Sequence, residues 1–254
     1  LDDERKRITD ELKNLGYYRF HKDFIQYDAY RIPGTHDIDL VLHLLKYKTS
    51  DDMPERPHPQ YRIRDVNFIQ QDSAAIPLRR QVLASNTAVK SGTLFSSRAL
   101  EKTYRNFGRL QAVRYTNIRF RELPDTTLLD CNIQLDTNKP STLSFQPEGT
   151  NTAGDLGAAA SVTYENRNLF RGSELLSIQL RAAYEAITGL EGYQNKDYQE
   201  YNVETKLSFP SFVAPLLSRT FRRRSLATSE LSVNWNLQNR PEFHRRVFST
   251  AWRY

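Results

Sequence analysis

The strongest constraint on the fold is an alternation of apolar and polar residues that runs from Pro140 to the end of the chain. Apolar side chains recur at every second position in six segments: Leu143–Pro147, Ala158–Tyr164, Ile178–Tyr184, Val203–Phe209, Leu231–Leu237 and Phe248–Tyr254. Successive side chains of a β-strand point to opposite faces, so this period predicts strands with one apolar and one polar face. No helix is predicted in this part of the chain.

Two all-β architectures have such strands: a soluble antiparallel sandwich and a transmembrane barrel. Aromatic residues lie near the ends of the predicted strands, as in the aromatic girdles of membrane barrels: Tyr164, Tyr184, Phe209, Trp252 and Tyr254. The mean hydropathy of −0.66 does not exclude a barrel, because only every second residue of a membrane strand must be apolar. The pattern favours the barrel and leaves the sandwich open.

The first part of the chain predicts soluble modules instead. A helix over Leu1–Asn14 is followed by strands over Tyr18–Ile32 and Asp37–Tyr47, which together make a partial module over residues 1–48. Closely spaced prolines stiffen a connection, so residues 49–60, which are rich in proline, are predicted to be a linker.

A complete α+β module is predicted over residues 61–139. Its elements are a strand at Tyr61–Ile69, helices at Leu78–Ser85 and Ser96–Leu110, and strands at Val113–Arg121 and Thr127–Asp136. The last three elements repeat the helix–strand–strand order of the first module, which indicates an internal repeat. Residues 140–254 then hold the amphipathic strands.

The charge pattern argues against a nucleic-acid partner. The net charge of +6 is spread along the chain rather than gathered on one segment. One dense cluster exists, Arg222–Arg224 with Arg219, and it is interpreted as a solvated loop, with contact to lipid headgroups or lipopolysaccharide as the alternative.

The sequence holds no recognisable catalytic or cofactor site. Its five histidines lack metal-ligand spacing, and there is no phosphate-binding glycine loop or nucleophile elbow. Cys131 alternates with apolar neighbours and is predicted to be a small buried strand residue. We therefore expect a non-enzymatic protein without a cofactor.

Several motifs resemble those of a known family. The run Lys90–Ser96, with the helix that follows it, resembles a POTRA domain, and Leu15–Phe20 resembles the helix-to-strand junction of a preceding one. The stretch Glu165–Glu174 resembles the first hairpin of BamA/TamA-type barrels, the bacterial surface antigen family of Gram-negative bacteria; Glu148–Gly157 and Arg240–Arg246 also fit. The combination is most similar to the TamA-like branch of Bacteroidota, whose members are often lipoproteins.

This resemblance implies α+β POTRA modules followed by an antiparallel all-β transmembrane barrel. Barrels of the family have about sixteen strands, and six strands cannot close around a lumen. The expectation is therefore a partial barrel, comprising the first strands only, with an exposed edge after Tyr254. The implied location is the outer membrane, with the N-terminal modules in the periplasm.

The implied function is assembly, insertion or translocation of outer-membrane proteins through β-strand pairing. The expected partners are nascent outer-membrane proteins, the lipid bilayer with lipopolysaccharide, and a periplasm-spanning protein. Two alternatives stay open: a soluble periplasmic scaffold or binding module built on a β-sandwich, and a two-partner secretion pore dedicated to one substrate.

Three groups of residues are candidates for this function. An edge strand of the second module would pair with client segments through Val113, Arg114, Tyr115, Thr116 and Arg119. A weak barrel seam would lie at Ser141, Leu143, Phe145 and Pro147, since proline cannot donate to a strand ladder. The hairpin motif comprises Asn166, Asn168, Phe170, Arg171, Gly172 and Glu174, with Arg171 and Glu174 predicted as an inward-facing polar pair at a tight turn.

Overall fold

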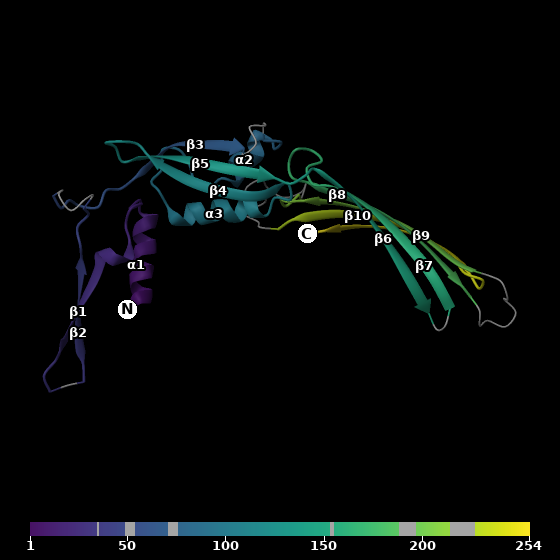
Figure 1. The fold of residues 1–254 in the computed structure, drawn as a ribbon, viewed down its shortest axis with the longest axis horizontal. Helices are drawn as coiled ribbons and strands as arrows, with labels where there is room; N and C mark the ends of the chain where they lie inside the picture. Colours follow the sequence, from purple (N-terminus) through teal and green to yellow (C-terminus); the bar gives the residue numbers. More distant parts are fainter. Residues whose placement is uncertain (35, 49–53, 71–75, 153–154, 188–196, 214–226) are drawn as a thin grey trace. The chain divides into compact units, whose positions relative to one another are not determined.

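The computed structural model describes residues 1–254 except 35, 49–53, 71–75, 153–154, 188–196 and 214–226. The predicted arginine cluster, the first part of the predicted linker and two residues of the Glu148–Gly157 motif lie outside the described residues. Within the described residues, the chain forms two compact units (Figure 1). The first comprises residues 1–74, 84–107 and 116–135, and the second comprises residues 75–83, 108–115 and 136–254.

The first unit begins with helix α1 (Asp2–Asn14), as predicted. The helix ends where Gly16 adopts a φ of +102°, a conformation that suits glycine at a helix C-terminus. A short 3₁₀ helix (Lys22–Phe24) precedes strands β1 (Ile25–Arg31) and β2 (Ile38–Leu44), which pair antiparallel.

The predicted strand over Tyr18–Ile32 was therefore wrong in its first seven residues. Phe20 is buried and stacks with Phe24, and both rings contact His58 at centroid distances of 4.9 and 4.6 Å. This aromatic packing folds the chain into a turn before β1 begins. His58 belongs to the predicted proline-rich linker, whose described part also forms a bridge between Tyr47 and Arg56.

The second module has the predicted order of elements. They are β3 (Arg62–Gln70), α2 (Arg80–Asn86), α3 (Ser97–Gly108), β4 (Val113–Glu122) and β5 (Leu128–Thr137). The strands form a sheet of order β3-β5-β4, in which β3 and β5 run parallel. Ser96 caps α3: its hydroxyl accepts a hydrogen bond from the Ala99 N–H at 3.3 Å.

The core of this module lies between the sheet and α3. Its most deeply buried side chains are Ile63, Phe107, Leu129, Cys131, Ile133 and Leu135. Cys131 is thus the small buried strand residue that was predicted, and burial raises the pKa of its thiol to about 12. Such a thiol stays protonated at neutral pH.

One charged group ties the three strands together. Asp130 on the central strand accepts two hydrogen bonds from Arg64 of β3, both at 2.7 Å, and one from Arg121 of β4 at 3.0 Å. These bonds, with Arg64 the larger contributor, hold the pKa of the Asp130 carboxyl below its ordinary value.

The second unit contains a six-stranded sheet of order β11-β10-β9-β8-β7-β6, and every neighbouring pair is antiparallel (Figure 1). The strands are β6 (Ser141–Thr152), β7 (Asp155–Asn166), β8 (Leu175–Ala186), β9 (Asp197–Phe209), β10 (Ser229–Asn239) and β11 (His244–Arg253). All six predicted strands are confirmed. No helix in the described part of the chain is long and apolar enough to cross a membrane.

Candidate functional site

The register of the six-stranded sheet places the apolar positions of all six strands on one face. One row across this face consists of Phe145, Val162, Leu180, Val203, Trp235 and Phe248. Apolar residues dominate the rows on either side of it, so the face carries an apolar band. On β10 the band extends from Leu231 to Leu237, about 20 Å at roughly 3.4 Å per residue, close to the band of about 25 Å on membrane barrels.

This apolar face is uncovered among the described residues. Phe145 at one edge of the sheet is 67% exposed and Phe248 at the other edge is 69% exposed, while Leu180 in the centre is 50% exposed. In a β-sandwich a second sheet would bury these side chains. Uncovered apolar surface of this extent marks a site of contact with another apolar phase or partner.

The opposite face is polar, and several of its charges are paired. Arg181 on β8 forms ion pairs with Glu148 on β6 at 3.0 Å and with Glu200 on β9 at 3.5 Å. Glu200 also accepts hydrogen bonds from Asn236 at 2.7 Å and Gln238 at 3.2 Å, both on β10. This network crosses from β6 to β10 and fixes the strands relative to one another.

The candidate seam residues Ser141, Leu143, Phe145 and Pro147 all lie on β6, an edge strand of the described sheet. Pro147 pairs with Ala160 of β7 in an uninterrupted register. Proline is compatible with this position because its ring nitrogen can face the free side of an edge strand, where no ladder bond is lost.

The second candidate edge is also an edge strand. Val113, Arg114, Tyr115, Thr116 and Arg119 lie on β4, at the end of the order β3-β5-β4. The edge of β4 is partly occupied, because the hydroxyl of Tyr104 on α3 accepts a hydrogen bond from the Ile118 N–H at 3.0 Å. Tyr104 thereby occupies a backbone donor in the middle of the strand. The sequence gave no sign of this bond.

The other edge of that sheet, β3, is occupied at its start. The Ile63 N–H donates to the Thr93 carbonyl, the Gly92 N–H donates to the Ile63 carbonyl, and the Phe95 N–H donates to the Tyr61 carbonyl, with distances of 2.8 to 2.9 Å. The POTRA-like run Lys90–Ser96 therefore bonds the start of β3 and forms an isolated bridge there between Leu94 and Arg62. The start of β3 is therefore closed to an added strand.

The hairpin motif is a junction that binds two other segments of the second unit, here called the hairpin junction and defined by Pro77, Arg79, Ala112 and residues 166–174. The Asn168 amide donates to the Pro77 carbonyl at 2.9 Å, and the Arg79 N–H donates to the Arg171 carbonyl at 2.9 Å. The Ala112 N–H donates to the Ser173 hydroxyl at 2.8 Å, and Ser173 is fully buried. The junction therefore joins the start of α2 and the start of β4 to the β7–β8 turn.

Glu174 is the centre of the hairpin junction. Its carboxylate is 6% exposed and accepts hydrogen bonds from the N–H groups of Phe170 at 3.2 Å and Gly172 at 2.9 Å. Its ion-pair partner is Arg79, at 3.1 Å. The predicted pairing of Arg171 with Glu174 was wrong. Arg171 has a φ of +59°, and its guanidinium lies toward the Pro77 carbonyl instead.

The other residues of the motif have roles that do not involve an ion pair of their own. A Cβ at Gly172 would overlap Glu174 Oε1 and Arg79 Nη2, so the ion pair as it stands leaves no room for a side chain there. Asn166 and Asn168 stabilise the turn: Asn166 Oδ1 accepts from the Asn168 N–H at 3.0 Å, and Asn168 Oδ1 accepts from the Ser173 N–H at 3.1 Å. Phe170 is exposed at the turn.

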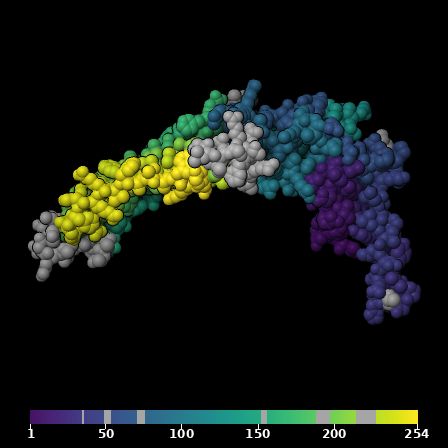
Figure 2. Space-filling model, turned by 180° about the vertical axis from the view of Figure 1, so that it is seen from behind, coloured from purple at the N-terminus to yellow at the C-terminus, as the bar shows by residue number. Residues whose placement is uncertain are grey.

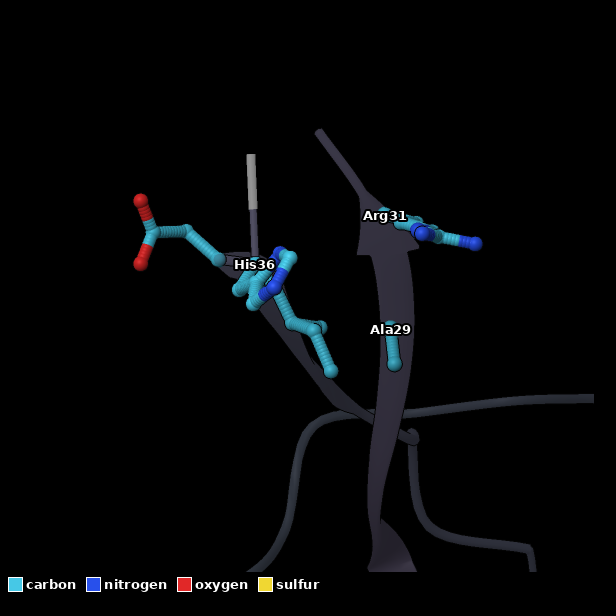
Figure 3. A pocket seen from close by; sticks show the side chains of 5 residues that line it. Ala29, Arg31 and His36 are labelled. Atoms are coloured by element: carbon cyan, nitrogen blue, oxygen red, sulfur yellow. The ribbon is translucent and has the colours of Figure 1, made fainter. Parts of the chain in front are cut away.

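A shallow depression lies at the tip of the β1–β2 hairpin and is lined by Ala29, Arg31, His36, Asp37 and Ile38 (Figure 3). Its charged side chains are exposed. No group of three or more potential metal ligands occurs in the part of the chain that the structure describes.

Solved structures resemble this fold, among them one of BamA and one of CdiB. BamA from Haemophilus ducreyi lacking POTRA domains 1–3 aligns with 98% of this chain at 10% sequence identity and a TM-score of 0.49, and this chain spans 50% of that chain. CdiB from Acinetobacter baumannii aligns with 76% of this chain at 13% identity and a TM-score of 0.41, and 41% of that chain is covered. The chain thus spans about half the length, or less, of each structure. No protein-family model and no curated protein matches the sequence.

Proposed function

We propose that this chain is part of an outer-membrane protein of the BamA/TamA type, which inserts or translocates outer-membrane proteins by pairing with their β-strands. The observation that carries the proposal is the amphipathic six-stranded sheet, whose apolar face is uncovered and whose edge strand β6 contains Pro147. In lipid an unpaired backbone edge costs several kcal/mol per group, so such an edge must find a strand to pair with.

Further features support the same function. The polar face holds paired charges, as expected for a barrel interior. The α+β module offers β4 as a second edge, suited to an extended peptide in the periplasm. The exposed apolar face argues against the soluble sandwich scaffold. Depleting the protein and counting the outer-membrane proteins affected would distinguish a role for many clients from a role for one secreted partner.

The β6 edge gives the direct test. A photocrosslinking residue at Ser144 or Gln146, on the polar face of β6, should capture nascent outer-membrane proteins. The matched control is the same residue at Gln179, which lies on β8 between two paired neighbours. Pro147→Val, which restores a backbone donor, should slow client insertion several-fold by tightening pairing at this edge.

Equal crosslinking from β6 and β8 would contradict strand pairing at the seam. Normal client insertion by the Pro147→Val variant would show that the proline plays no part in it. Both measurements use the intact protein in membranes, where expression and folding are checked on the same samples.

A separate prediction concerns the β4 edge. Tyr104→Phe removes the hydroxyl that accepts the Ile118 N–H and leaves that donor free to bind a peptide. We expect extended peptides to bind this edge more tightly, by about tenfold at most, since one hydrogen bond contributes about 0.5–1.5 kcal/mol. Peptide titration followed by the amide resonances of β4 measures the change, and Tyr115→Phe, an exposed tyrosine on β4 itself, is the control.

A further inference from the structure

The apolar face of the six-stranded sheet carries different residue types at its two ends. At the end where the hairpin junction lies, aromatic rings gather: Trp252 contacts Phe209 and Tyr254, each at a centroid distance of 6.2 Å. At the other end the face carries positive charge. Arg246 and His244 occupy alternate positions of β11, in line with Phe248 and Trp252, and they therefore share the apolar face.

The surroundings of Arg246 make it unusual among the charged residues of the sheet. Its row contains Leu237, Tyr201, Ala182 and Pro147, and the next row contains no carboxylate. Among the described residues, the nearest acid on this face is Asp197, one row further on and two strands away, where it bonds Tyr184. Glu242 lies in the turn before β11, and no ion pair between it and Arg246 occurs among the described residues.

Two arginines of the polar face provide the contrast. Arg181 is paired with Glu148 and Glu200, and Arg253 is paired with Glu230 at 3.1 Å. Arg246 instead is exposed at the border of an apolar band, on the strand seen as a continuous yellow strip in Figure 2. An arginine at this depth can keep its stem on the apolar surface and extend its guanidinium to the water interface.

We propose that Arg246, with His244 beside it, binds the phosphate of an anionic lipid headgroup at the end of the sheet opposite the hairpin junction. The guanidinium can donate two parallel hydrogen bonds to a phosphate. No acid in the rows of Arg246 and His244 competes with the phosphate for this charge. The acyl chains of the bound lipid then lie along the apolar face over Trp235, which pairs with Phe248 one row nearer the centre. The inference rests on the proposed function, because it requires this face to meet lipid.

Trp235 provides a local probe. The intact protein, carrying Trp252→Phe so that one tryptophan remains on this face, is reconstituted into vesicles that contain phosphatidylglycerol or phosphatidylcholine with brominated acyl chains. Bromine quenches a tryptophan only in close contact. We expect Trp235 to select phosphatidylglycerol over phosphatidylcholine by about fivefold, the effect of one basic residue near an anionic surface, and Arg246→Gln to abolish the preference.

The control is Arg245→Gln, which removes the same charge one residue away but from the polar face. It should retain the preference for phosphatidylglycerol. Equal quenching by both lipids, or equal loss in the two variants, would overturn the headgroup site while leaving the membrane-spanning sheet intact. Absence of quenching by either lipid would instead overturn the proposed function, because the face would then not contact acyl chains.

Discussion

A single arginine in the centre of the apolar face should be among the most damaging substitutions in this protein. Leu180 lies in the middle row, between Val162 and Val203, and is 50% exposed. If this face meets lipid, Leu180→Arg places a charge near the midplane of the bilayer, at a cost of about 2–4 kcal/mol. The free energy of unfolding from vesicles, measured by urea titration, should fall by this amount.

Gln179→Arg is the matched control, because it adds the same side chain one residue earlier on the polar face. There it lies opposite Glu204, with which it can pair. We expect its effect on the free energy of unfolding to be within about 0.5 kcal/mol. If both variants lose stability equally, the two faces do not differ in environment. If the wild-type protein stays monodisperse without detergent, the apolar face is covered by protein and the sandwich is favoured.

The sequence predicted this face because its information is local. Each strand carries its own alternation, so a strand such as Leu231–Leu237 can be predicted from its own residues alone. The register that aligns Phe145 with Val162 is a property of pairs of strands, and no single segment encodes it. Prediction therefore identified the strands and their faces, and the structure supplied the rows and the ends of the band.

The errors arose where distant residues determine local structure. Phe20 and Phe24 were interpreted as strand positions, but both rings contact His58, so a contact between segments overrides the local pattern. Arg171 was paired with Glu174 because the two are close in sequence. The true partner, Arg79, lies 95 residues away, and nothing in its own segment distinguishes it from its neighbour Arg80.

The hairpin junction is the second site at which a small change should have a large effect. Gly172→Ala would drive a methyl group into Glu174 Oε1 and Arg79 Nη2 and so force the buried carboxylate away from its partners. Moving the carboxylate would break its ion pair and disturb the two backbone N–H bonds to Oε2, inside a site where Glu174 is 6% exposed. We expect a loss of about 2–4 kcal/mol, below the full cost of breaking a buried pair because Arg79 is half-exposed. Urea unfolding and hydrogen exchange at the Ala112 amide measure it.

Gly149→Ala is the control for this substitution, since a Cβ at Gly149 meets no atom within 4 Å. It should be neutral or stabilising by up to about 1 kcal/mol, as for glycine replaced where the backbone tolerates a side chain. Arg79→Ala separates charge from space: it removes the ion pair but leaves the two backbone donors to Glu174, so its effect should fall between the two glycine variants. Equal stability of Gly172→Ala and Gly149→Ala would show that the junction does not hold Glu174 as described. A faster exchange at Ala112 in Gly172→Ala alone would show that the carboxylate supports the whole junction, because Ala112 bonds Ser173 and not Glu174.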